Sequence, residues 1–66
     1  MTKEEALLAL KDGEKLSHRY FDPHEWVREE DGVYIFEDGC RCEPVDFWAF
    51  RDGNSWNYDW RIWSDD

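Results

Sequence analysis

The stretch VYIFEDGCRC (residues 33–42) decides the fold, because it joins the strongest strand signal in the chain to its clearest turn. Residues 33–36 are a run of β-branched and aromatic side chains between two acidic Gly turns, which is typical of a strand. Asp38-Gly39 is a frequent centre of a tight hairpin turn, and residues 40–42 can return as the partner strand. The stretch therefore predicts an antiparallel hairpin.

On the C-terminal side of this hairpin, residues 56–63 (WNYDWRIW) alternate between apolar and polar positions, which predicts one long strand. The side chains expected on one face of it are those of Trp56, Tyr58, Trp60 and Ile62. Trp63 is expected on the opposite face. Between the hairpin and this strand, Glu43-Pro44 predicts a short helical segment over residues 45–50.

On the N-terminal side, Thr2 and Glu5 match a capping box, in which each side chain accepts a hydrogen bond from the backbone N–H of the other residue. An apolar stripe at helical spacing follows and stops before Gly13, which predicts a helix over residues 3–11. Residues 15–21 alternate in hydrophobicity and predict a first strand.

Two further signals lie between that strand and the hairpin. Asp22-Pro23 predicts the start of a short helical turn, and the acidic run EEDG (residues 29–32) predicts the turn that ends it. Together the elements predict a single small α+β domain over residues 1–66. One N-terminal helix packs on a three- to four-stranded antiparallel sheet, and short helical turns connect the rest.

The chain has 66 residues and a formal net charge of −9, from 17 Asp and Glu against 8 Lys and Arg. This size leaves room for one domain with a small core, and none for a dinucleotide fold or a barrel. The aromatic content of 18% distinguishes the sequence from a disordered acidic chain. The charge predicts no direct nucleic-acid binding and no membrane association. It exceeds what solubility requires and favours a basic partner.

Four side chains of the types that bind zinc are present, but their spacing does not match a zinc site. Cys40 and Cys42 are separated by one residue, and His18 and His24 lie on another segment. No nucleophile or phosphate-loop motif is present, and no carboxylate pair stands out as catalytic. We therefore expect no metal, no cofactor and no enzymatic activity. Two cysteines also fit an intracellular protein with reduced thiols better than a secreted domain.

Acidic turns and partly exposed aromatic side chains are the candidate partner-binding features. Two acidic groups flank the strand predicted at residues 33–36, and turns are exposed, so their carboxylates are expected to be available to a basic surface. Trp63 is the candidate aromatic anchor, because the alternation places it opposite the predicted core row. The predicted partner-binding residues are Glu29, Glu30, Asp31, Glu37, Asp38 and Trp63.

Both ends of the chain resemble a family of phage proteins. The start, EALLALKDG (residues 5–13) followed by a predicted strand, and the end, DWRI (residues 59–62), resemble the Thoeris anti-defence domain. The middle, with Phe47-Trp48 after an acidic hairpin, is similar to small phage proteins of about this length. The chain is shorter and more acidic than that domain and lacks its central insertion. The resemblance implies a phage or prophage protein that acts against a defence system in the host bacterial cytoplasm.

Small acidic phage proteins include anti-CRISPR inhibitors that imitate DNA, and the resemblance implies an inhibitor of this type. We expect a monomer or small homo-oligomer that occupies the basic DNA-binding surface of a host nucleoprotein defence complex, with carboxylates in place of phosphates. In a CRISPR effector, the vulnerable groove is the one that reads the short flanking motif. The alternative, which the anti-defence domain implies, is an oligomer that sequesters a nucleotide signal. Its phosphate contacts would come from Arg19, Arg28, Arg41, Arg51 and Arg61.

Overall fold

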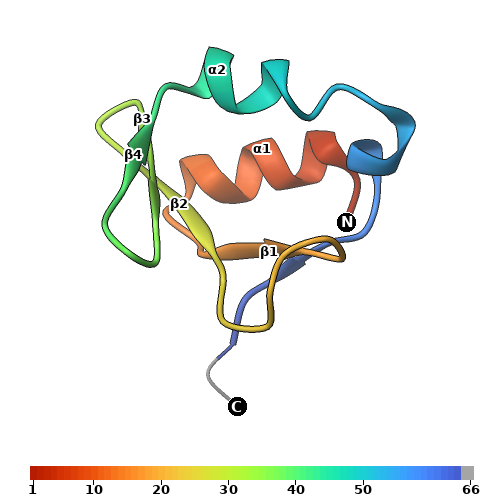
Figure 1. The fold of residues 1–66 in the computed structure, drawn as a ribbon, viewed down its shortest axis with the longest axis horizontal. Helices are drawn as coiled ribbons and strands as arrows, with labels where there is room; N and C mark the ends of the chain where they lie inside the picture. The colour runs from red at the N-terminus through yellow and green to blue at the C-terminus, as the bar shows by residue number, and fades with distance from the viewer. Residues whose placement is uncertain (65–66) are drawn as a thin grey trace.

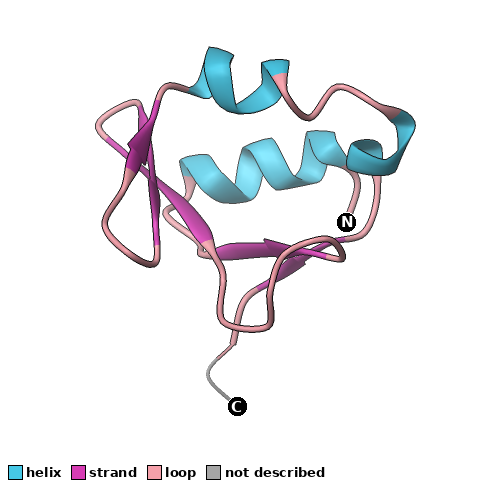
Figure 2. Cartoon of the chain, viewed as in Figure 1, coloured by secondary structure: helices cyan, strands magenta, loops and turns pink. Residues whose placement is uncertain are grey.

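The computed structural model describes residues 1–64, which form one five-stranded antiparallel sheet, two α-helices and a short 3₁₀ helix (Figure 2). In chain order the elements are α1 (Lys3–Lys11), β1 (Leu16–His18), β2 (Val27–Glu30), β3 (Val33–Phe36), β4 (Arg41–Cys42), α2 (Pro44–Ala49), the 3₁₀ helix η1 (Asn54–Asn57) and β5 (Trp60–Ile62). The strand order is β4-β3-β2-β1-β5. The predicted α+β class is confirmed, with five strands where three or four were expected.

Helix α1 has the bounds and the N-terminal cap that the sequence predicts. The Thr2 hydroxyl accepts a hydrogen bond from the Glu5 N–H at 3.2 Å, and the Glu5 carboxylate accepts one from the Thr2 N–H at 2.9 Å. Gly13 follows the helix with a φ of 86°, a conformation that glycine adopts without steric cost. On its buried side the helix contributes Ala6 and Leu10 to the core.

The predicted hairpin over residues 33–42 is confirmed as β3 and β4. A second hairpin precedes it, because β2 and β3 are joined by Asp31-Gly32, whose φ angles of 53° and 80° match a tight type I′ turn. The prediction for this region was wrong in part: residues 22–25 form a single turn, in which the Glu25 N–H donates to the Asp22 carbonyl at 2.9 Å, but no helix follows, and Glu29 and Glu30 lie on strand β2 rather than in a turn. Pairing with the apolar strand β3 overrides their low strand propensity.

The predicted strand over residues 56–63 was also wrong in its first half. Residues 54–57 form η1, and β5 begins only at Trp60, because Asp59 has a φ of 69° and interrupts the alternation. Tyr58 is consequently 60% exposed instead of buried. The first predicted strand is shorter than residues 15–21, because β1 ends at His18 and a turn follows, in which the Phe21 N–H donates to the His18 carbonyl at 2.9 Å.

Both α-helices cover the same face of the sheet, which we call the inner face. In Figure 1, α1 runs across the middle of the molecule, with α2 on one side of it and β1 on the other. Phe47 of α2 contacts the rings of Tyr34 and Phe36 on β3, at centroid distances of 5.0 and 5.9 Å. The buried core of this face consists of Ala6, Leu10, Leu16, Val27, Tyr34, Phe47 and Trp60.

The register of the strands defines the opposite, outer face, because paired residues on neighbouring strands point to the same side of a sheet. The paired residues on this side are Ser17 with Arg61, Arg28 with Ile35, Glu30 with Val33, and Ile35 with Arg41. Within residues 1–64, the helices contribute their buried side chains to the inner face and leave the outer face to the strands and their flanking residues.

The first residue of the chain is paired with the last strand. The Trp60 N–H donates a hydrogen bond to the Met1 carbonyl at 3.2 Å, and the Met1 ammonium donates one to the Trp60 carbonyl at 2.7 Å. These two bonds lie on the edge of β5 that β1 does not use.

Candidate functional site

The acidic group 29–31 does not form one continuous patch. Consecutive residues of a strand point to opposite faces, so Glu29 lies on the inner side, opposite Tyr34, while Glu30 lies on the outer side. The Glu30 carboxylate is paired with the Arg28 guanidinium at 3.4 Å. Only Asp31 occupies the exposed turn that the sequence analysis expected for all three.

Glu37 and Asp38 lie on the exposed turn between β3 and β4, as predicted. The Asp38 carboxylate accepts a hydrogen bond from the Cys40 N–H at 2.9 Å, and this bond holds the pKa of Asp38 below its ordinary value of 3.8. The two acidic groups sit at opposite ends of the four-residue strand β3, about 13 Å apart along it.

The lowered pKa of Asp38 predicts a pH-dependent turn. A carboxyl group with a depressed pKa in the folded state stabilises that state above its unfolded pKa, and the contribution is lost as pH falls through the folded value. We expect the amide proton shift of Cys40 to change as pH falls below 3.8, in an NMR titration. In Asp38→Asn the amide oxygen can still accept the bond but does not titrate, so that shift should stay constant. An equal pH response in the variant would contradict this assignment.

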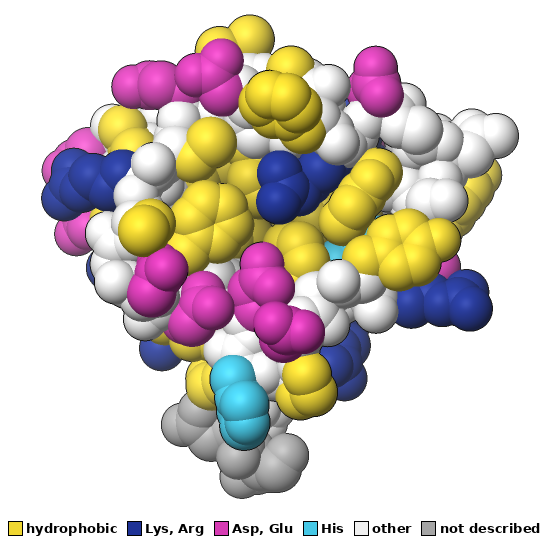
Figure 3. All heavy atoms as spheres, viewed as in Figure 1, with side chains coloured by type: hydrophobic (Ala, Val, Ile, Leu, Met, Phe, Trp, Pro, Cys, Tyr) yellow, Lys and Arg dark blue, Asp and Glu magenta, His cyan; other side chains and the backbone are white. Residues whose placement is uncertain are grey.

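Few carboxylates are neutralised by neighbouring cations. Within residues 1–64 the ion pairs are Arg28–Glu30 and the exposed Arg19–Asp59 contact at 3.9 Å. Most described acids lie on helix ends and connections and face solvent. In Figure 3, carboxylates appear at several separate places around a central hydrophobic area. The acidity of the chain is therefore available on the surface and is not used in internal pairing.

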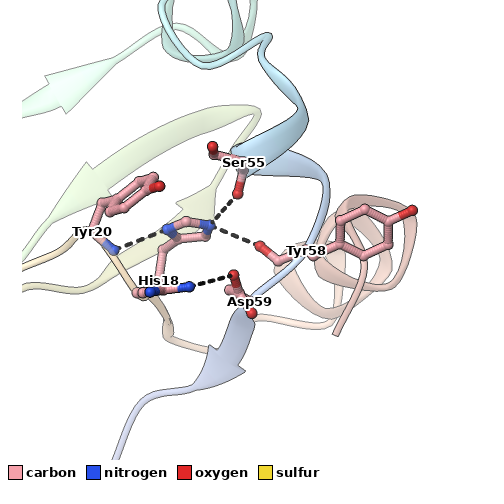
Figure 4. A network of polar contacts seen from close by, with 6 residues as sticks. His18, Tyr20, Ser55, Tyr58 and Asp59 are labelled. Carbon is pink, nitrogen blue, oxygen red and sulfur yellow. Dashed lines mark hydrogen bonds and ion pairs between the residues drawn. The ribbon is translucent and has the colours of Figure 1, made fainter.

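A buried polar centre that the local sequence did not reveal lies at His18, which is 1% exposed (Figure 4). Its Nδ1 accepts a hydrogen bond from the Tyr20 N–H at 3.1 Å, which leaves Nε2 as the donor. Nε2 lies 2.8 Å from the Tyr58 carbonyl and 3.1 Å from the Ser55 carbonyl. The ring thus binds the η1–β5 connection to the end of β1, and every polar atom of the imidazole has a structural partner.

Arg51 is the second feature that the sequence did not reveal. Its guanidinium lies over the Phe47 ring at 4.1 Å and near the Trp56 ring at 5.4 Å, and it donates a hydrogen bond to the Phe47 carbonyl. Burial lowers its pKa. The Arg51 side chain therefore packs at the edge of the core, between α2 and η1.

Trp63 lies on the outer side of the sheet, as the alternation predicted, because it follows Ile62, whose partner Leu16 is on the inner side. Its ring is 6.2 Å from that of Trp26, and the Lys15 ammonium lies over both rings. The Trp63 side chain is partly buried. Trp63 lies beside Trp26 on the outer side, while the two acidic groups lie at opposite ends of β3, so the predicted site residues do not form one cluster.

Neither a candidate metal-binding cluster nor a helix that could span a membrane is found among residues 1–64. No group of three or more His, Cys, Asp or Glu side chains there could hold a metal ion. Cys40 and Cys42 are free thiols. None of the described helices has the length and apolar character needed to cross a bilayer.

The chain matches no protein-family model, and no curated protein and no solved structure is significantly similar to it.

Proposed function

We propose that the protein is an anti-defence inhibitor of the anti-CRISPR type, which occupies the basic DNA-binding surface of a host nucleoprotein complex as an acidic mimic of DNA. The observation that carries this proposal is the surplus of surface carboxylates without a cationic neighbour in a chain of net charge −9. Such a surplus adds self-repulsion to a small fold, and a basic partner would relieve it.

The mechanism is occupancy and needs no catalytic group. Lysine and arginine side chains that normally contact DNA phosphates would instead donate charge-assisted hydrogen bonds to carboxylates. The turns at Asp31 and at Glu37-Asp38 are suited to this role, because both are exposed and project from the two ends of β3. Glu29 and Glu30 are less suited, since one faces the inner side of the sheet and the other is paired with Arg28.

Two double variants test which turn carries the inhibition. Glu37→Gln/Asp38→Asn and Glu30→Gln/Asp31→Asn each remove two charges at one end of β3, and neither touches the buried core. We expect at least one of them to weaken inhibition of target-DNA binding about tenfold or more, because several charge-assisted contacts are lost together. The measurement is a gel-shift competition with purified CRISPR effector complexes and their target duplexes.

A matched control removes the same charge elsewhere. Asp12→Asn/Glu14→Gln changes two exposed acids next to Gly13 and should leave inhibition within about twofold of the parent. Inhibition by both turn variants that equals that of the parent would refute the mimicry. So would an affinity for the target complex that is unchanged between low and high salt. Recovery of a bound nucleotide from the purified protein would favour the sequestering alternative.

A further inference from the structure

The outer face of the sheet has the opposite charge from the rest of the protein. Four of its side chains are cations, and they come from four strands or strand ends: Lys15, Arg28, Arg41 and Arg61. Glu30 is the one carboxylate among the outward-facing residues of the strands within residues 1–64. Counted over the strands alone, Arg28, Arg41 and Arg61 against Glu30 give this face a formal charge of +2, which leaves −11 for the remainder of a chain of net charge −9.

The cations extend across the whole sheet. Arg41, Ile35 and Arg28 are direct cross-strand neighbours on β4, β3 and β2, and Arg61 on β5 is paired with Ser17 on β1. At the usual strand spacing the five strands span about 19 Å. Arg41 and Arg61, at the two edges, are exposed and have no carboxylate within ion-pair distance among the described residues.

Two indole rings lie within this basic face. Trp26 and Trp63 are partly exposed, their ring centroids are 6.2 Å apart, and Lys15 holds them together through cation–π contacts of 4.6 and 5.6 Å. The Trp63 indole N–H and the Ser17 hydroxyl oxygen have no hydrogen-bond partner within residues 1–64. Both atoms are buried, so the part of this cluster that a ligand can reach is the two indole rings.

We propose that the outer face binds single-stranded nucleic acid. Arg41 and Arg61 contact phosphates, and the rings of Trp63 and Trp26 stack on bases. A positive sheet surface with interleaved aromatic rings is the arrangement that sequence-tolerant single-strand binding requires, since every base has a face that can stack. An acidic protein would satisfy the cations but would leave the aromatic pair without a specific role.

This inference goes beyond the proposed inhibition and does not depend on it, because the contacts it assigns are made by cations and indole rings and not by the carboxylates of the acidic turns. It also departs from the expectation that net charge excludes nucleic acid. At physiological salt the screening length is about 8 Å, so a bound strand responds mainly to the charges of the face it contacts.

The test is a titration of the intact chain with fluorescein-labelled dT12, followed by fluorescence anisotropy at 50 and 200 mM salt. The two phosphate contacts predict that affinity falls about sevenfold between the two salt concentrations. Arg41→Gln and Arg61→Gln should each weaken binding several-fold and reduce that salt dependence. Arg19→Gln is the matched control, because Arg19 is equally exposed but belongs to the β1–β2 connection beside Asp59. It should leave the affinity unchanged.

NMR of the indole N–H groups locates the contact. Binding of dT12 should shift the signals of Trp26 and Trp63. Those of Trp48 and Trp60, whose N–H groups donate to the Tyr34 hydroxyl and the Trp56 carbonyl on the inner side, should not move. Three results would overturn the proposal. The first is no binding of dT12 at 50 mM salt. The second is equal binding of polyphosphate, which has no bases. The third is tighter binding of poly-glutamate, which would indicate an acidic protein partner.

Discussion

Replacement of Trp60 by alanine is expected to unfold most of the protein at 25 °C. The Trp60 side chain is 2% exposed and is the largest residue in a core of seven buried side chains. Its ring packs edge-on against Phe21 and Trp48, and its indole N–H donates to the Trp56 carbonyl at 2.8 Å. Truncation of a buried Trp costs about 3–5 kcal/mol. Small domains have a total stability near the lower end of about 5–15 kcal/mol.

Urea and thermal unfolding followed by circular dichroism measure this effect. Tyr58→Ala is the control, because Tyr58 is a similarly large aromatic residue two positions away and is 60% exposed. Its free energy of unfolding should change by about 0.5 kcal/mol or less. A Trp60→Ala variant with the transition of the parent would show that the Trp60 ring does not support the core.

The second large effect is expected for His18→Leu. Leucine fills much of the volume of the imidazole but cannot donate to the Tyr58 carbonyl or accept from the Tyr20 N–H, so two partly buried backbone groups lose their partner. Each unsatisfied buried group costs about 1–3 kcal/mol, and we expect a total loss of about 2–4 kcal/mol. Chemical denaturation gives the value directly.

His24→Leu is the matched histidine control. His24 is exposed in the β1–β2 connection, and its replacement should leave the free energy of unfolding nearly unchanged. Backbone amide exchange adds a local measurement, because loss of the His18 ring should accelerate exchange in η1 and at the start of β5 more than in α1. Uniform acceleration throughout the chain would contradict the role of His18 as a local link.

The elements that could be predicted are those whose signals are local. The capping box at Thr2 and Glu5 defined the start of α1, and the Asp38-Gly39 turn defined the β3–β4 hairpin. The prediction of one strand over residues 56–63 failed, because the alternation there comes from large aromatic side chains, which pack at many angles. The chain turns at Asp59, and the carbonyls of Ser55 and Tyr58 lie against His18. This contact is long-range, so the local sequence does not predict it.

The candidate site was predictable only in part. The exposure of Asp31 and of the Glu37-Asp38 turn followed from turn chemistry. The placement of Glu29 and Glu30 on opposite faces of the sheet could not be predicted. It depends on β2 being a strand, and a run of acids gives a weak strand signal. The positive outer face could not be predicted from the composition. Its four cations are spread between residues 15 and 61, and only the strand order β4-β3-β2-β1-β5 brings them to one face.

The edges of the sheet limit how any other polypeptide can join this protein. β4 is only two residues long, and on β5 the outward N–H and carbonyl of Trp60 are already taken by Met1. Strand addition, in which a guest chain extends a sheet through backbone hydrogen bonds, needs a longer row of open groups. Neither edge offers such a template for intermolecular aggregation or for capture of an extended peptide. Recognition must therefore use side chains on faces and turns, where a single substitution can weaken one contact without disturbing the sheet.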